Sequence, residues 1–298
     1  AMAAEADVIV AIGTRLQDFT TGSWTSFKAD AQFISINAAR FDATKHRAIS
    51  VVGDARESLR EMDAALGDWS APDTWMEKGR DEMAKWDSLI DELQKPSNAH
   101  IPSYAQVIKV VQDNAKTEDL VITAAGGPPG EVNKCWRVKA PNTVDTEFGF
   151  SCMGYEIPAG WGAAMADENR TPIVIIGDGT YMMANSEMAT AAMMGVSFTV
   201  IVTDNRGFGC INRLQMGTGG AEFNNLLKDA VHETPSAIDF AAHAASMGAT
   251  SVKVSSISEL EQALAKRGDI TGPYVIVIDT DPYPSTPHGG SWWEVGVP

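Results

Sequence analysis

The sequence has 298 residues, 44% of them hydrophobic, which is enough for one large core or two ordinary ones. Its formal net charge of −16 argues against nucleic acid as a partner, because so acidic a chain repels phosphate backbones. No apolar run approaches the roughly 20 residues of a membrane span, and no signal-peptide pattern is present, so we expect a cytoplasmic protein that does not enter a membrane. The three cysteines lack metal-binding spacing and are expected to be reduced thiols.

The first part of the chain, residues 1–72, contains short apolar runs that end in turn residues. Such β-branched runs are typical of buried parallel strands. We expect these strands at residues 8–13, 33–37 and 49–53. Three strands make only half of a doubly wound sheet, and few domains start directly in a strand, so we expect further sequence upstream. Residues 73–98 are rich in charge and predict a surface helix followed by a linker.

The remaining part, residues 99–298, alternates strand-like and helical patterns, with Ser103 placed to cap a helix. The expected strands are 119–124, 143–146, 172–176, 198–203, 251–254 and 274–279. Alternation predicts an α/β fold, a doubly wound parallel sheet, preceded by part of a second, Rossmann-like α/β domain in residues 1–72. Residues 205–235 show no clear period, and we expect a long functional or mobile loop there.

A glycine-rich turn, Gly177-Asp178-Gly179, follows one expected strand, and Asn205 follows the next strand 27 residues after Asp178. Because parallel strands end at the same edge of a sheet, both polar side chains are expected at that edge. Carboxylate and amide oxygens suit Mg²⁺, and the backbone N–H groups of Gly179 and Thr180 at a helix start suit a phosphate. Gly-Asp-Gly alone is typical of a plain turn, but the whole arrangement predicts a metal and phosphate site.

This arrangement resembles the diphosphate-binding domain of thiamine-diphosphate (ThDP) enzymes. The resemblance implies that Asp178, Asn205 and the main-chain carbonyl of Gly207 hold Mg²⁺, which clamps the cofactor diphosphate. It also implies that Gly177, Gly179 and Thr180 line the cofactor site.

Two residues before the Gly-Asp-Gly turn have further roles by the same resemblance. Met153 is the apolar wedge that holds ThDP bent, and the carbonyl of Ser151 accepts a hydrogen bond from the cofactor's amino group. Met153 taken by itself is typical of a core methionine.

Residues 123–130 look like the second diphosphate loop of these enzymes. Acetolactate synthases carry Gln and His at the positions of Gly127 and Pro128. Since Pro128 has no N–H to donate, phosphate contacts would have to come from the amides of Gly126 and Gly127. An ordinary Gly/Pro turn is the alternative.

Several strings are closer to one family, the trihydroxycyclohexanedione hydrolases of myo-inositol catabolism. They are residues 124–126, 149–156, 204–212, 214–216 and 290–297. This resemblance implies a ThDP- and Mg²⁺-dependent hydrolase that cleaves a C–C bond of a cyclic trihydroxy-diketone. The alternatives are an acetolactate-synthase-like lyase, a 2-oxoacid decarboxylase, or a non-catalytic binding module of the same fold. A nicotinamide-binding dehydrogenase is disfavoured because no G-x-G-x-x-G follows the strand ending at Gly13.

The resemblance also implies parts that this sequence does not contain. The first block resembles the end of the family's central domain, for which no residue predicts a bound nucleotide. The Glu that activates ThDP lies on a separate pyrimidine-binding domain, usually supplied by a partner subunit. We therefore expect a fragment with no catalytic residue of its own, inactive alone, from a dimeric or tetrameric homo-oligomer. His288 and Trp292-Trp293 are candidates to cover the cofactor edge, with solvation or packing as the alternative.

Overall fold

The computed structural model describes residues 2–147, 149–234 and 236–287. The chain up to Leu89 forms one compact unit, and Ile90–Thr286 forms another. Among these residues, no helix combines the length and the apolar composition that a membrane span requires. All three cysteines are free thiols. The predicted domain boundaries at residues 72 and 98 stay a prediction.

The first unit is a small parallel sheet with short helices. Its strands β1 (Val8–Ile12), β2 (Gln32–Asn37) and β3 (Ile49–Val52) pair in the order β1-β2-β3. Its helices are α1 (Met2–Glu5), α2 (Asp18–Thr21), α3 (Arg40–Ala43), η1 (Lys45–Arg47) and α4 (Ala55–Leu66). The long helix α5 (Asp73–Leu93) then leads from the first unit to the second.

The expectation that these three strands are buried is wrong for β3 and for most of β1, whereas the end of β2 is buried from Ser35 to Asn37. Every residue of β3 is exposed, and so are Val8 and Ile12 of β1. Ala11 and Ile36 are the apolar strand residues that this unit buries among the described residues. A β-branched run predicts the strand itself, but it does not say whether another layer covers each face.

The second unit is the doubly wound sheet that the sequence predicts. Its strands are β4 (Val121–Thr123), β5 (Val144–Thr146), β6 (Ile173–Gly177), β7 (Phe198–Asp204), β8 (Thr250–Val254) and β9 (Pro273–Asp279). They pair in parallel in the order β5-β4-β6-β7-β9-β8, so the predicted fold class is confirmed.

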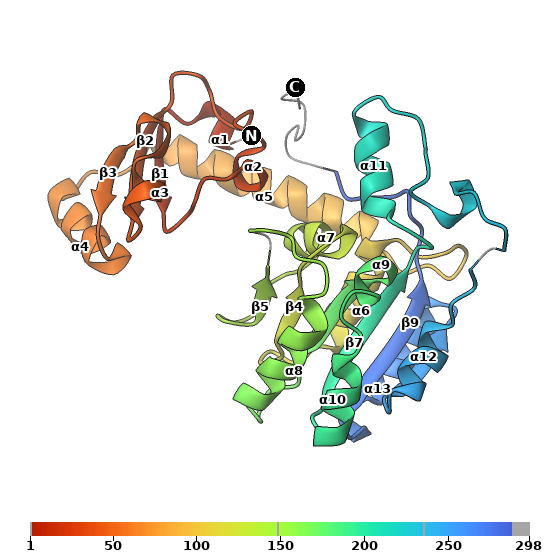
Figure 1. The fold of residues 1–298 in the computed structure, drawn as a ribbon. Coiled ribbons are helices and arrows are strands. Elements are labelled where there is room, and N and C mark those ends of the chain that lie inside the picture. The colour runs from red at the N-terminus through yellow and green to blue at the C-terminus, as the bar shows by residue number, and fades with distance from the viewer. Residues whose placement is uncertain (1, 148, 235, 288–298) are drawn as a thin grey trace. The chain divides into compact units, whose positions relative to one another are not determined.

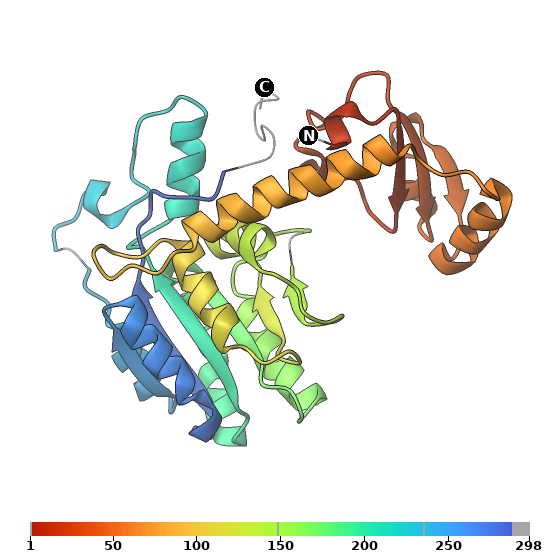
Figure 2. The same cartoon turned by 180° about the vertical axis from the view of Figure 1, so that it is seen from behind.

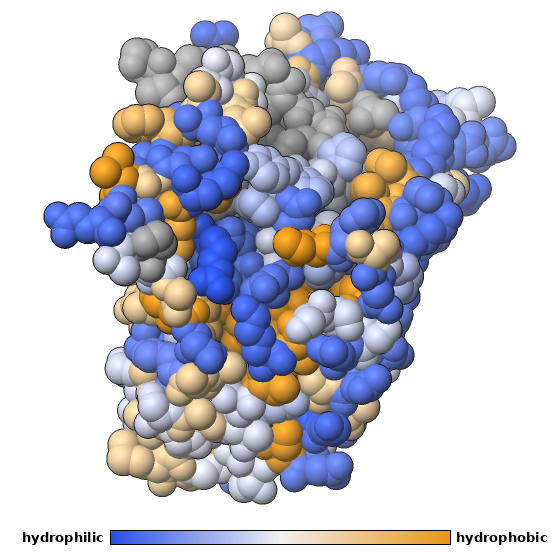
Figure 3. All heavy atoms as spheres, turned by 90° about the vertical axis from the view of Figure 1, so that its right-hand side faces the viewer, coloured by the Kyte–Doolittle hydropathy of each residue, from blue (hydrophilic) through white to orange (hydrophobic). Residues whose placement is uncertain are grey.

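Helices cover both faces of this sheet (Figures 1 and 2). One face carries α6 (Tyr104–Asn114), α7 (Gly127–Cys135) and α13 (Ile257–Ala265). The other carries α8 (Glu156–Ala166), α10 (Glu187–Met194) and α12 (Phe240–Ser246). The shorter elements are α9 (Asp178–Tyr181), α11 (Gly209–Gly217), η2 (Leu227–Asp229) and η3 (Arg267–Asp269). On the face shown in Figure 3, hydrophilic residues predominate and hydrophobic ones form small separate patches, as the acidic composition leads one to expect.

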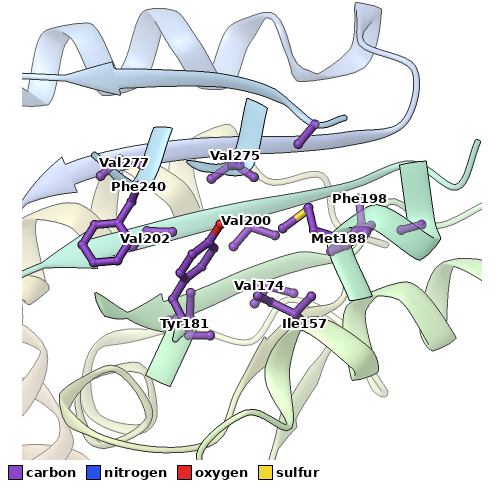
Figure 4. Close-up of a cluster of buried hydrophobic side chains, with 14 of the residues drawn as sticks. Ile157, Val174, Tyr181, Met188, Phe198, Val200, Val202, Phe240, Val275 and Val277 are labelled. Atoms are coloured by element: carbon purple, nitrogen blue, oxygen red, sulfur yellow. The ribbon is translucent and has the colours of Figure 1, made fainter. Parts of the chain in front are cut away.

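The hydrophobic core on the α8 side of the sheet includes α9, the short helix that begins in the Gly-Asp-Gly turn. Tyr181, the last residue of α9, is fully buried and packs edge-to-face on Phe240, with ring centroids 5.5 Å apart (Figure 4). Its hydroxyl forms a hydrogen bond of 3.0 Å with Nδ1 of His243. Burying such aromatic rings supplies much of a core's stabilisation, so Tyr181 anchors α9 in the core against α12.

In the second unit, two α-helices lie where the sequence predicts none. The expected loop at residues 205–235 contains α11, which is short and has a glycine at each end, so its helical period is hard to detect. Likewise α7 begins within the Gly/Pro run, with prolines in its first turn, where a missing N–H costs nothing. The predicted cap at Ser103 is confirmed, because Ser103 and Gln106 form a reciprocal capping box.

Helix α8 offers a matched pair of glycines that tests this packing. A Cβ at Gly160 would lie 2.5 Å from Cγ2 of Val174, whereas a Cβ at Gly162 would meet nothing within 4 Å. We expect Gly160→Ala to destabilise this unit by about 1–3 kcal/mol through overpacking. Gly162→Ala should stabilise it by about 0.5–1 kcal/mol through helix propensity. Hydrogen exchange of α8 and β6 peptides in urea measures both, and equal effects would contradict the close packing.

Candidate metal and phosphate site

The candidate site begins where β6 and β7 end. The two strands pair as far as Gly177 and Thr203, so Asp178 and Asn205 leave the sheet at the same edge. Asp178 is buried, and its Oδ2 accepts a hydrogen bond of 2.9 Å from the N–H of Gly207. The structure therefore brings Asp178 into contact with Gly207, through the N–H of Gly207 and not through its carbonyl, which is the predicted ligand. The same end of the sheet carries α7 and α9 (Figure 1).

The side chain of Asn205 has one satisfied and one unsatisfied end. Its Nδ2 donates a hydrogen bond of 2.6 Å to the hydroxyl of Tyr104, which is itself buried. Its Oδ1 is buried and has no hydrogen-bond partner among the described residues. Leaving a buried acceptor without a partner costs about 1–3 kcal/mol. A hard cation would satisfy this amide oxygen, so the residues fit a bound Mg²⁺.

Gly207 occupies a conformation that a side chain would prevent. Its φ is +148°, and a Cβ there would lie 2.5 Å from the carbonyl oxygen of Asn225. The neighbouring backbone pairs with the same segment, because Phe208 N–H donates to Asn225 and Leu227 N–H donates to the carbonyl of Arg206. This short antiparallel pairing holds the Gly207 N–H against Asp178.

The electrostatics of this edge favour a bound cation. Burial and the nearby Asp204 carboxylate raise the pKa of Asp178 to about 7, against the hydrogen bonds from Gly207 and Gly179. Burial likewise raises the pKa of Asp204, which pairs with Arg206. A cation beside Asp178 would lower its pKa again and offset the cost of burying its charge.

The predicted second diphosphate loop lies beside the Gly-Asp-Gly turn. Gly126 caps α7 with φ +81°, and a Cβ there would lie 3.9 Å from Oγ1 of Thr180. Gly127 is buried, and a Cβ there would lie 2.9 Å from the Arg213 guanidinium and 3.0 Å from the Tyr104 ring. The structure thus brings Gly126 next to Thr180, and Gly127 next to the tyrosine that contacts Asn205.

Ser151 and Met153 lie in one turn before α8. Ser151 has φ +52°, and its hydroxyl donates a hydrogen bond of 3.4 Å to the carbonyl of Ala124 in the second loop. Met153 is 39% exposed, so the alternative of a core methionine is wrong. Gly154 has φ +96° and lies against Met183, where a Cβ would be 3.1 Å from that side chain.

Three residues near the site have contacts that no local sequence pattern predicts. Tyr104 contacts Asn205, His243 contacts Tyr181, and Glu156 accepts hydrogen bonds from backbone near Gly126 and Met153. Glu156 carries the one detectable signal, since it is an acid at a helix start inside an otherwise apolar run. The predicted covering residues His288 and Trp292-Trp293 lie outside the described residues.

The protein ligands at this edge are few. Within the part of the chain that the structure describes, no three His, Cys, Asp or Glu side chains cluster as a metal site. The candidate site offers one carboxylate, one amide oxygen and main-chain carbonyls. Mg²⁺ commonly combines such a small protein set with substrate phosphates and water.

Comparison with known proteins defines the class. Residues 124–278 match the sequence model of the thiamine pyrophosphate enzyme, C-terminal TPP binding domain, and residues 1–62 match that of the thiamine pyrophosphate enzyme, central domain. Thiamine pyrophosphate is ThDP. The chain belongs to the thiamine pyrophosphate enzyme family.

Curated relatives show which members of that family the chain is similar to. The chain is 32% identical over 331 residues to 3D-(3,5/4)-trihydroxycyclohexane-1,2-dione hydrolase of Bacillus anthracis. It is 33% identical to an enzyme of Bacillus cereus that has the same name with the suffix 2, and 31% identical to the enzyme of Bacillus thuringiensis (strain Al Hakam). Each alignment covers 99% of this chain and 51% of the relative. The chain spans about half the length of these relatives, and the predicted resemblance is confirmed.

The loop that holds Gly207 gives a test that requires no ligand. Gly207→Ala places a methyl group on the carbonyl of Asn225 and should separate residues 206–208 from 225–227. We expect at least about 10-fold faster hydrogen exchange at Phe208 and Leu227, equivalent to about 1.4 kcal/mol of local stability. Gly217→Ala is the matched control, because a Cβ there meets nothing within 4 Å. Unchanged exchange in Gly207→Ala would show that the pairing does not depend on this glycine.

Proposed function

We propose that this chain binds ThDP together with Mg²⁺ at the carboxyl edge of β6 and β7. The observation that supports it most is the buried, unpartnered Oδ1 of Asn205 at the edge where Asp178 also leaves the sheet. Asp178, Asn205 and the carbonyl of Gly207 are the proposed protein ligands. Diphosphate oxygens would complete the oxygen shell that Mg²⁺ prefers.

The remaining predicted residues have roles that follow from their positions. Backbone N–H groups of Gly179 and Thr180, at the start of α9, and of Gly126 and Gly127, at the start of α7, would face the diphosphate. Gly177, which caps α9, leaves open space at the site because a Cβ there would meet nothing within 4 Å.

The turn before α8 would meet the other half of the cofactor. The carbonyl of Ser151 would accept a hydrogen bond from the aminopyrimidine, and the partly exposed side chain of Met153 would pack against the bent cofactor. Both assignments rest on the resemblance of this turn to that of ThDP enzymes, and on the exposure of Met153.

For the whole protein, we propose hydrolytic cleavage of a C–C bond in a cyclic trihydroxy-diketone. This proposal rests on the names of relatives that are about one-third identical to the chain. ThDP supplies the electron sink that such a carbon–carbon cleavage needs. The chain described here would hold and orient the cofactor, and a pyrimidine-binding domain, contributed within a homo-oligomer, would supply the activating Glu.

Cofactor binding is the direct test of the site. Titration of the chain with ThDP by calorimetry should show binding with Mg²⁺ and none after chelation with EDTA. Removing a ligand by Asp178→Asn or Asn205→Ala should weaken binding about 100-fold or more, since even outer-shell losses cost 10–100-fold at metal sites. Asp167→Asn and Asn169→Ala, in the turn after α8, are matched controls. Metal-independent binding, or full affinity in both site variants, would contradict the proposal.

Turnover tests the proposed division of roles. We expect the 298-residue chain to bind Mg²⁺ and ThDP yet to leave both the cyclic diketone and pyruvate unchanged, because the activating Glu would be supplied elsewhere. Chromatographic assays of both substrates measure this. Cleavage of the diketone by the chain alone would contradict the need for a second domain, and consumption of pyruvate would favour a lyase or decarboxylase.

A further inference from the structure

Glu156 is a buried carboxylate next to the candidate site. It is the first residue of α8, and its exposed fraction is 0%. No Lys, Arg or His among the described residues forms an ion pair with it. A buried carboxylate is costly unless hydrogen bonds replace its water, so the partners of Glu156 show what it does.

Those partners are main-chain groups of two separate loops. Oε1 accepts a hydrogen bond of 3.0 Å from the N–H of Ala125, and Oε2 accepts one of 3.2 Å from the N–H of Gly154. One side chain therefore joins a loop 31 residues away in sequence to the turn directly before its own helix.

Each loop carries residues that the proposed function assigns to a different half of the cofactor. Gly126 and Gly127 follow Ala125 on the diphosphate side, and Ser151 and Met153 precede Gly154 on the aminopyrimidine side. Both loops contain left-handed backbone, at Gly126, Ser151 and Gly154. Such backbone, above all at the non-glycine Ser151, persists only when its surroundings hold it in place.

We propose that Glu156 is a positioning residue. It fixes the spacing between the diphosphate loop (residues 123–130) and the aminopyrimidine turn (residues 151–154), so that one ThDP molecule fits both. This inference rests on the proposed function. A carboxylate suits the role because both of its oxygens accept hydrogen bonds. A Gln at this position would turn an NH₂ group toward one of the two N–H donors and break one of the two connections.

The test compares a ligand that spans both loops with one that reaches only the diphosphate loop. With Mg²⁺ held in excess, calorimetry measures the affinity of wild type and Glu156→Gln for ThDP and for inorganic pyrophosphate. We expect the variant to lose about 10-fold or more in ThDP affinity, the effect of one lost hydrogen bond to a charged group. Its pyrophosphate affinity should change less than about 2-fold.

Pyrophosphate binding also serves as the folding control within the same variant. Glu131→Gln is a matched control, because Glu131 is a buried carboxylate in α7 whose partners are Thr286 and Lys134 instead of the two loops. If Glu156→Gln does not fold, Glu156→Asp carries the same expectation, since the shorter side chain cannot reach both loops.

The outcomes separate this inference from the proposed function. Suppose that the wild-type chain binds Mg²⁺-ThDP. An equal loss of affinity for both ligands in Glu156→Gln, or no loss of ThDP affinity in that variant, would then overturn only the proposed role of Glu156. A wild-type chain that binds neither ligand would overturn the proposed function, and the role of Glu156 with it.

Discussion

The structure of the site follows from the parallel pairing of β6 and β7. Because these neighbouring strands run in the same direction, whatever follows each of them meets at one edge of the sheet. Here those positions hold an acid and an amide, Asp178 and Asn205, and both are buried. Burying a carboxylate, and burying an amide oxygen that has no donor, both cost free energy, and a cation at this edge would offset that cost.

Contacts from the rest of the unit hold the residues at this edge of the sheet in position. Tyr181 anchors α9 in the core, and Tyr104 holds the amino end of the Asn205 amide, which leaves the oxygen free. The pairing of residues 206–208 with 225–227 positions the N–H of Gly207 to donate its hydrogen bond to Asp178. Each contact joins segments far apart in the sequence, so the site is a property of the folded sheet and not of the short Gly-Asp-Gly turn.

Sequence patterns predict the sheet well, because its central strands contain continuous β-branched runs such as 173–176 and 199–202. They missed α11 and α7, since glycine and proline hide a helical period although both are tolerated in a first turn or between packed segments. They missed the roles of Tyr104 and Glu156 for another reason. Which partner a polar side chain finds 31 or 101 residues away depends on the tertiary fold, and no local pattern records it.

The most direct test of a cation between Asp178 and Asn205 is crystallographic. Crystals of this chain grown with Mn²⁺ and pyrophosphate would locate the metal by its anomalous scattering. We expect a single strong peak at bonding distance, about 2.0–2.3 Å, from a carboxylate oxygen of Asp178 and from Oδ1 of Asn205. A peak elsewhere, with the Asn205 oxygen still without a partner, would contradict it.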